Sequence, residues 1–443
     1  MTVFTPLESA KPIDSSAKGE RSRISVSLLR QQLAQELHNR PSPQVDGQTS
    51  ITHMAVRYTE QEQHQAYQHL ITLCHRYSVN PPSPEASCYY QDFGGFELRW
   101  ERHHEFSSYS FIRKGIGQRL FDGYAIAYVP QEWLDNIGGE LVSAVNLVIS
   151  EDILSEQALF DAFEGHQVLG SKVAENRADV FASFRIHSDG FGRIIIQSHR
   201  LNRYQVGRLM QRMLEIQTYQ LMALLSLPIA RSLSADVAQM ELDLVDINQK
   251  MSAVGEKNDN EMLNRLSCLA GKTEQLIANI SYRFSATNAY YDLVCSRLEQ
   301  LKETDIEGIE RISEFVTRRL SPGIRTCQAL SNRLDELTRR IARASSLLRT
   351  RVDLTIEQQN QQLLSAINKR GEIQLRLQQM VEGVSIAAMA YYLMGLLDYM
   401  LDAVNVVGYP INKVIVKGLA VPILLCLTWL LLRLAMGYIK KPR

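Results

Sequence analysis

Two long apolar runs near the end of the sequence constrain its fold most strongly. The first covers residues 384–407 and the second covers residues 414–439, with only a short turn between them. Each run is long enough to cross a hydrocarbon core of about 30 Å as a helix. The sequence therefore predicts a transmembrane hairpin over residues 381–443, which would be embedded in a lipid bilayer.

Polar side chains interrupt the first of these predicted spans. Asp398 and Asp402 are four residues apart and so share one helical face, and Asn405 lies one heptad after Asp398. An acid inside a bilayer costs several kcal/mol unless it faces protein or water, so we treat these residues as a candidate ion path. The alternative is that both aspartates lie near the interface and reach out to it.

Positive charge on either side of the hairpin predicts its orientation. Basic residues precede the first span and follow the second, while Lys413 and Lys417 near the turn are a weaker signal of opposite sense. The flanking residues are Lys369, Arg370, Arg376, Lys440, Lys441 and Arg443. The positive-inside rule then predicts that both termini are cytoplasmic.

The totals for the whole sequence exclude several classes of protein. With 443 residues the chain exceeds one ordinary domain, and its formal net charge of +0 argues against a dedicated nucleic-acid binder. Residues 1–20 are polar and lack the apolar region of a signal peptide. The six cysteines include no CxxC pair, which predicts reduced thiols and no zinc or disulfide framework. All ten histidines lie at or before His199.

Residues 1–24 are predicted to be a flexible arm, and residues 25–200 an α+β domain with a mixed sheet in the cytosol. Apolar alternation predicts strands at 51–58, 88–92, 96–112, 124–128, 141–149, 178–186 and 193–198. Helical spacing predicts helices at 24–38, 61–77 and 155–164. Glycine-containing turns at 94–95 and 188–190 are typical of hairpins.

Charged residues alternate along the strand predicted over residues 97–106. Alternation places Glu101, His103 and Glu105 on one face, and His104 with Trp100 on the other. Such a face could hold a metal, but charged alternation is more often a solvated face, and three ligands on one flat strand rarely converge. No catalytic motif is complete, so the sequence predicts no enzyme, cofactor or metal site, with an enzyme using His103 and His104 as the weakest alternative.

From residue 201 to residue 380 the sequence predicts a helical stalk. Breaks are expected at Pro228, at Gly255 and at 321–323, and residues 324–407 should form one helix about 120 Å long. The arginine-rich stretch 318–351 is predicted to face acidic helices such as 241–246. A coiled-coil seam comprises Val352, Ile356, Leu363, Ile367, Leu377, Val381 and Val384, interrupted by Asn360, Arg370 and Gln374.

Three stretches, 36–41, 98–109 and 376–392, resemble an uncharacterised bacterial family of membrane-anchored proteins, a domain of unknown function. The likeness spans nearly the whole chain, although Asn39 replaces the small residue expected there. It implies anchoring in the bacterial inner membrane and implies no reaction. The motif residues, whose role is unknown, are Glu36, His38, Arg40, Pro41, Trp100, Glu101, His104, Glu105, Glu382, Gly383, Tyr391 and Tyr392.

The order of domains is more distantly similar to that of CorA-type divalent cation channels. That likeness implies a homo-oligomer, by analogy a pentamer, whose first span lines a pore for divalent cations. The Gly-Met-Asn signature of those channels is replaced here by Gly-Tyr-Pro-Ile-Asn at 408–412, so selectivity does not carry over. The sequence leaves two main expectations: a cation channel or transporter, or a non-conducting scaffold or tether whose cytosolic domain binds a partner.

Overall fold

The computed structural model describes residues 29–30, 43–117, 119–253, 259–406 and 412–439. The predicted arm, most of the helix expected at 24–38 and residues 407–411 between the apolar runs therefore lie outside the described residues. The elements in chain order are β1 (Thr49–Arg57), α2 (Glu60–Arg76), β2 (Cys88–Asp92), β3 (Glu97–Arg102), β4 (Phe106–Lys114), η1 (Ala125–Tyr128), α3 (Gln131–Asp135), β5 (Glu140–Ser150), α4 (Glu156–Ala162), β6 (Leu169–Val173), β7 (Ala178–Ala182), β8 (Gly192–Ser198), α5 (Arg203–Leu224), α6 (Ser226–Ala253), α7 (Asp259–Leu301), α8 (Ile312–Val406) and α9 (Lys413–Ile439).

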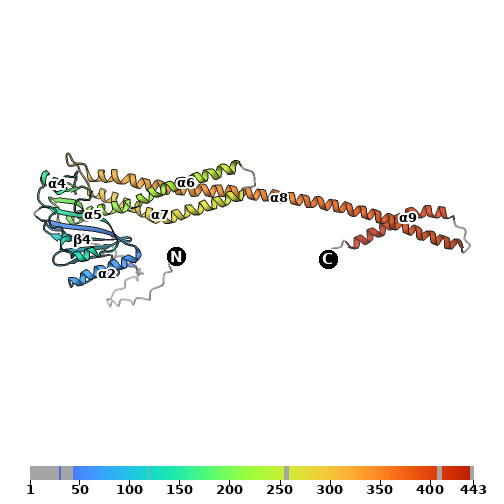
Figure 1. Ribbon diagram of the computed structural model, residues 1–443, viewed down its shortest axis with the longest axis horizontal. Coiled ribbons are helices and arrows are strands. Elements are labelled where there is room, and N and C mark those ends of the chain that lie inside the picture. The colour runs from blue at the N-terminus through green and yellow to red at the C-terminus, as the bar shows by residue number, and fades with distance from the viewer. Residues whose placement is uncertain (1–28, 31–42, 118, 254–258, 407–411, 440–443) are drawn as a thin grey trace, which may run out of the picture. The chain divides into compact units, whose positions relative to one another are not determined.

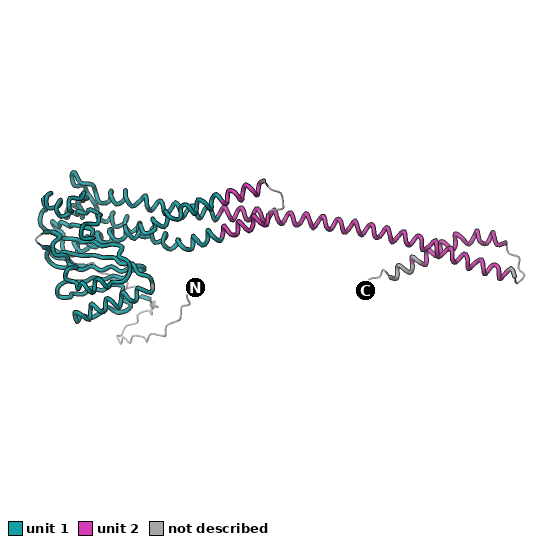
Figure 2. The backbone as a smooth tube through the Cα atoms, in the orientation of Figure 1, with its two compact units in different colours: residues 1–242, 271–338 teal, residues 243–270, 339–443 magenta. Residues whose placement is uncertain are grey.

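The described residues divide into two compact units (Figure 2). Unit 1 comprises residues 1–242 and 271–338, and unit 2 comprises residues 243–270 and 339–443. Helices α6, α7 and α8 each contribute one part to unit 1 and another part to unit 2.

Unit 1 is built on one sheet of eight strands, and the prediction of a mixed sheet is confirmed. The strand order is β2-β3-β4-β1-β5-β8-β7-β6, and β5 pairs with β8 in parallel while the other neighbours are antiparallel. Helices α2 and α4 cover one face of the sheet and α5 covers the other (Figure 1). The sheet is therefore covered on both sides, and its strands bury polar as well as apolar side chains, such as Thr52 and His53 of β1 and Ser108 and Ser110 of β4.

Side-chain alternation along the strands decides which helix each strand contacts. In β1, Ile51 and Ala55 join the core under α5, whereas Met54 and Val56 join the core under α2. The core under α5 is completed by residues of α7 and of the first turns of α8, including Val294, Leu298, Ile312, Val316 and Leu320. Segments that are distant in sequence therefore pack together in one hydrophobic core.

Capping residues fix where the two main covering helices begin. Thr59 accepts a hydrogen bond from the backbone of Glu62 while the Glu62 side chain accepts one from the backbone of Thr59. Asn202 and Gln205 form the same reciprocal pair at the start of α5. Each cap satisfies backbone donors that the first helical turn leaves without partners.

Two sequence predictions about local structure are wrong. Residues 124–128, expected to be a strand, contain the short 3-10 helix η1. A helix break was expected at 321–323, but α8 continues through Pro322. The core holds this segment in place, because Gly323 lies so close to the core that an added Cβ would be 3.1 Å from Leu224. Strand β6 was not predicted at all.

The helical part of unit 1 is a bundle of α6, α7 and α8. Its apolar core includes Val237 from α6, Phe284 from α7 and Leu334 from α8. Arg333 of α8 binds Glu241 of α6 through two hydrogen bonds of 3.0 and 2.8 Å. The prediction that the arginine-rich stretch faces acidic residues of α6 is confirmed for this pair.

Unit 2 contains the C-terminal helix pair. Helix α9 lies antiparallel to the end of α8, and ion pairs between the two helices join Lys417 to Asp398 and Lys413 to Asp402. Before this pair, residues 356–381 of α8 are all exposed. Three described stretches are long and apolar enough to cross a membrane: Arg203–Ser252, Ile312–Val404 and Lys413–Leu431. The apolar face of α5, in the first of them, is already buried against the sheet.

Candidate functional site

A buried histidine joins the sheet to α5. His53 of β1 lies opposite Ser110 of β4 in the sheet register, and its Nδ1 is 2.8 Å from the Ser110 hydroxyl. Its Nε2 is 3.1 Å from the hydroxyl of Thr218 on α5. Burial lowers the pKa of His53 to about 4, so the ring is neutral at pH 7. Because both ring nitrogens already have hydroxyl partners, His53 serves as a structural link rather than as a free base.

A buried ion pair lies on the same face of the sheet. Arg99 donates to Glu101 at 2.8 Å, and the two side chains are only 5% and 15% exposed. They line a cavity of about 30 Å³ together with His53, His103 and Glu215. A cavity of that size holds a water molecule or two and no larger substrate. Glu101, a family-motif residue, is therefore part of a packed polar layer.

The predicted strand face of Glu101, His103 and Glu105 forms only in part, because Glu101 and His103 line the same cavity whereas Glu105 lines a different hollow. Strand β3 ends at Arg102 and β4 begins at Phe106, and the backbone N–H of His103 bonds the carbonyl of Phe106 at 2.9 Å in the turn between them. Residues 103–105 therefore leave the strand alternation. The expectation of one shared face was wrong for Glu105 because the pattern continued across a tight turn.

This β3–β4 turn contacts α7. Glu105 accepts from Arg283, and the two side chains are 11% and 10% exposed. Burial, and then a hydrogen bond with Glu105, raises the pKa of Tyr290, so its hydroxyl remains protonated. The ring of His104 packs against Tyr282 with 5.9 Å between ring centroids. Two family-motif residues thus attach the sheet to the helices.

A hollow of about 700 Å³ opens beside that turn. It is lined by His104, Glu105 and Arg283, and at its rim by Arg57 and Glu140. Both guanidinium groups are paired, Arg283 with Glu105 and Arg57 with Glu140 at 2.5 Å. The lining also includes Glu62, whose carboxylate accepts hydrogen bonds from the backbone N–H and the hydroxyl of Thr59, both at 2.9 Å. The charged groups of the hollow are therefore held by neighbouring residues.

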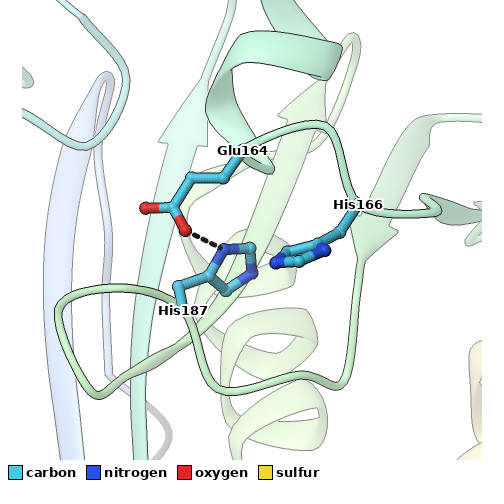
Figure 3. Close-up of side chains that lie close together, drawn as sticks. All are labelled: Glu164, His166 and His187. Carbon is cyan, nitrogen blue, oxygen red and sulfur yellow. Dashed lines mark hydrogen bonds and ion pairs between the residues drawn. The ribbon is translucent and has the colours of Figure 1, made fainter.

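A second polar cluster lies towards the β6 edge of the sheet, at the same ends of the strands as the β3–β4 turn. Glu164 and His166 belong to the loop after α4, and His187 belongs to the loop between β7 and β8 (Figure 3). One ligand atom from each of the three side chains lies within 4.8 Å of those of the other two. Among the described residues, this is the set of three that could hold a metal ion.

Hydrogen bonds fix the members of this cluster. Nδ1 of His187 is 3.3 Å from Oε2 of Glu164, and its Nε2 is 2.8 Å from the hydroxyl of Ser183. Oε1 of Glu164 accepts from Arg193 at 2.8 Å and also from the hydroxyl of Ser188. Hydrogen bonds from Ser188, more than the charge of Arg193, hold the pKa of Glu164 at about 2.

Sequence reasoning did not find this cluster. Glu164 and His166 are two residues apart, but His187 follows only after β6 and β7, which carry the chain out of the loop and back to it. The only signal in the sequence was the confinement of all histidines to the N-terminal half. Because β6 was not predicted, the return of the chain to this loop could not be predicted either.

The acidic residues of the predicted ion path lie between α8 and α9. Asp398 pairs with Lys417 and Asp402 pairs with Lys413, while their side chains remain 44% and 57% exposed. The side chain of Asn405 lies outside the described residues. The structure therefore brings the two aspartates together with the two lysines that the sequence treated only as an orientation signal.

The remaining family-motif residues occupy different places. Trp100 is buried in the core under α2, and Glu382 is half-buried on α8. Tyr391 and Tyr392 are exposed on α8, with their ring centroids 6.1 Å apart. An added Cβ at Gly383 would meet open space. The motif residues at 36–41 lie outside the described residues.

Comparison with known proteins gives one match. The family described as "Protein of unknown function (DUF3422)" matches residues 27–437. No curated protein and no solved structure matches the chain. The likeness to CorA-type channels therefore stays a prediction.

Proposed function

The chain belongs to the DUF3422 family of proteins of unknown function, and from this premise we propose that it is a membrane-anchored tether. In this role α9 and the end of α8 cross the bacterial inner membrane, and unit 1 binds a partner in the cytosol. The observation that carries the proposal is the apolar helix pair, because the most hydrophobic 18-residue window of α8 contains no buried residue in the part of the chain that the structure describes. A bilayer is the environment that covers such a surface.

The ion pairs of the helix pair also support insertion as a hairpin. An unpaired carboxylate or ammonium group inside a bilayer costs several kcal/mol, and pairing offsets part of that cost. Asp398 with Lys417 and Asp402 with Lys413 leave no net charge on this part of the hairpin. Lysines close to the turn are then compatible with both termini on the cytoplasmic side.

Self-association is the second part of the proposal. Residues 356–381 are all exposed, and Leu363, Ile367 and Leu377 expose more than half of their surface. Most helical stability in proteins comes from the packing of an apolar face, and a row of exposed apolar side chains favours a partner helix. The 3-4 spacing of these residues is that of a coiled coil, and membrane anchoring requires parallel copies, so the partner we propose is a second copy of this chain.

A cation channel is the second candidate function. The 3-4 spacing of the seam continues from Val384 through Tyr391 to Asp398 and Asp402. Association along this seam would bring the carboxylates of several copies towards a common axis, where oxygen ligands suit divalent cations. The ion pairs with Lys413 and Lys417 count against this role, because they neutralise the same carboxylates.

Membrane fractionation tests the anchoring. The full chain should remain in membranes washed with alkaline carbonate, and a variant lacking residues 381–443 should be soluble. Release of the full chain by carbonate would overturn the proposed anchor. The mass of the full chain in nanodiscs then gives the number of copies, and a monomer would refute the self-association.

Flux into liposomes separates the tether from the channel. A tether gives no divalent cation flux above that of empty liposomes. If flux is found, Asp398→Asn should abolish it, and the matched double variant Asp398→Asn with Lys417→Gln keeps the local net charge unchanged. Loss of flux in both variants would assign conduction to the carboxylate itself, and the tether proposal would then be wrong.

A further inference from the structure

We propose that Glu164, His166 and His187 bind one Zn²⁺ ion at the end of the sheet in unit 1. Two imidazoles and one carboxylate form a ligand set that zinc accepts, with a water molecule in the fourth position. The three side chains come from two loops that β6 and β7 separate in sequence, so one ion would join these loops.

The distance between two of the donors, a long hydrogen bond, also fits zinc coordination. Nδ1 of His187 and Oε2 of Glu164 are 3.3 Å apart, longer than the usual N–H···O distance of about 2.9 Å. Two ligands at about 2.0–2.1 Å from a tetrahedral zinc ion stand about 3.3–3.4 Å apart. A zinc ion therefore fits between these atoms without a change in their separation.

Neighbouring groups hold the donor atoms in place through hydrogen bonds, as the outer partners of metal ligands do. Ser183 lies 2.8 Å from Nε2 of His187, which leaves Nδ1 as the nitrogen that faces Glu164. Arg193 and the hydroxyl of Ser188 donate to one carboxylate oxygen of Glu164, Oε1, and the backbone N–H of Ser188 donates to Oε2 at 3.1 Å. Together these bonds fix the direction of Oε2, which keeps a further lone pair for a metal ion. Metal-binding histidines and carboxylates are held in this way by outer partners.

The charges of the cluster favour a cation. Arg193 is shared between Glu164 at 2.8 Å and Asp189 at 3.2 Å, so one positive charge meets two negative charges. Burial lowers the pKa of His187, and hydrogen bonds lower that of Glu164, so the donors are a neutral imidazole and a carboxylate at pH 7. These are the protonation states in which the two groups bind metals.

The site is open to solvent on one side. The side chain of Glu164 is 29% exposed and lines a hollow of about 780 Å³, whereas that of His187 is fully buried. The ring of His166 is half-buried and contacts the ring of His187, with 5.3 Å between centroids. The ring makes no hydrogen bond with the described residues, so its nitrogens are available to an ion.

Titration of the full chain in detergent with Zn²⁺, against a chromophoric chelator, tests the proposal. One ion should bind per chain, and His166→Ala should weaken binding at least tenfold, because it removes one of three ligands. This variant should fold normally, since it breaks no hydrogen bond. The matched control is His199→Ala, which removes a partly exposed histidine paired with Asp179 at 3.1 Å and should leave Zn²⁺ affinity unchanged.

Spectra of the Co²⁺-substituted protein exclude the cysteines as ligands. Ligation by nitrogen and oxygen gives visible absorption without the strong thiolate band in the near ultraviolet, and His166→Ala should remove the visible absorption. Zn²⁺ should also raise the melting temperature of the wild type and not of His166→Ala. Equal Zn²⁺ affinity in wild type and His166→Ala, or no binding in the wild type, would overturn the proposal.

Discussion

At the scale of single residues, the chain uses buried polar side chains to join its layers. His53 links β1 to β4 and to α5, and Arg283 links α7 to Glu105 in the turn between β3 and β4. Such groups contribute only when each has its partner, because an unpartnered polar group in a core costs free energy. Removal of one such side chain should therefore lower the free energy of unfolding strongly, because its partner is left buried without a hydrogen bond.

The buried His53 predicts that the free energy of unfolding depends on pH. Its pKa is about 4 in the folded chain and 6.5 in the unfolded chain, so between these values only the unfolded chain binds the proton. The stability that neutral His53 provides is complete above pH 6.5 and falls by about 3 kcal/mol as the pH decreases to 4. Denaturant unfolding of His53→Gln should show a smaller decrease over this range.

Comparing the pH dependence of stability in wild type and in His53→Gln separates the contribution of His53 from that of other groups. Burial also lowers the pKa of His187, which contributes a loss of the same sign in both proteins. An equal decrease in stability in wild type and His53→Gln would show that His53 is not the titrating group.

The Arg283–Glu105 pair predicts a large cost for removing one partner. Arg283→Ala leaves a buried carboxylate without its counter-charge and should lower the free energy of unfolding by about 3–5 kcal/mol. The exposed pair Arg57–Glu140, with side chains 38% and 62% exposed, is the matched control. Arg57→Ala should cost less than about 1 kcal/mol, and equal costs for the two variants in urea denaturation would contradict the argument.

At the scale of elements, local patterns predicted most of the sheet and the helices that cover it. Strands β1, β2, β5 and β8 and helices α2 and α5 follow from apolar runs bounded by caps or turns. Patterns failed where tertiary contacts decide the structure. Residues 103–105 keep a strand pattern but form a turn, and Pro322 lies inside α8 because the surrounding core holds the helix there.

The candidate sites were predictable to different degrees for the same reason. Asp398 and Asp402 can be recognised from the sequence because acidic residues are rare inside a long apolar run. Their pairing with Lys417 and Lys413 depends on the packing of α8 against α9, which spacing alone does not give. Glu164, His166 and His187 violate no local rule, and only the folded loops bring them together.

Pro322 predicts a stabilising substitution within α8. The proline cannot donate the backbone hydrogen bond of its position, and its side chain is exposed, so no packing is lost on its removal. Pro322→Ala should raise the free energy of unfolding by about 1–3 kcal/mol. A thermal or urea unfolding curve that shows destabilisation would mean that the proline itself shapes the contact of this helix with the core.

At the scale of the whole molecule, the sheet depends on helices far along the chain. The core under α5 combines Val45 and Ile51, from the first strand and the segment before it, with Ile312 and Ile324 from the start of α8. A fragment limited to residues 25–200 would expose the whole face that α5, α7 and α8 cover. The sheet is therefore not complete in that segment by itself.

Expression of two fragments tests this dependence. A fragment of residues 25–200 should be insoluble or lack cooperative unfolding, because exposed apolar surface lacks its partner layer. A fragment of residues 25–350 retains the whole described part of unit 1 and should be soluble, with a sharp thermal transition. A cooperatively folded 25–200 fragment would show that the helical layer is dispensable for the sheet.

This dependence has a consequence for the order of events during translation. Strand β8 ends at Ser198, but the segment that completes the core begins at Ile312, 114 residues later. At about 5–20 residues per second, the ribosome needs roughly 6–23 s to deliver that segment. During this interval the nascent sheet presents an apolar face without its full cover, so the growing chain should be a substrate for chaperones before its hydrophobic hairpin has been synthesised.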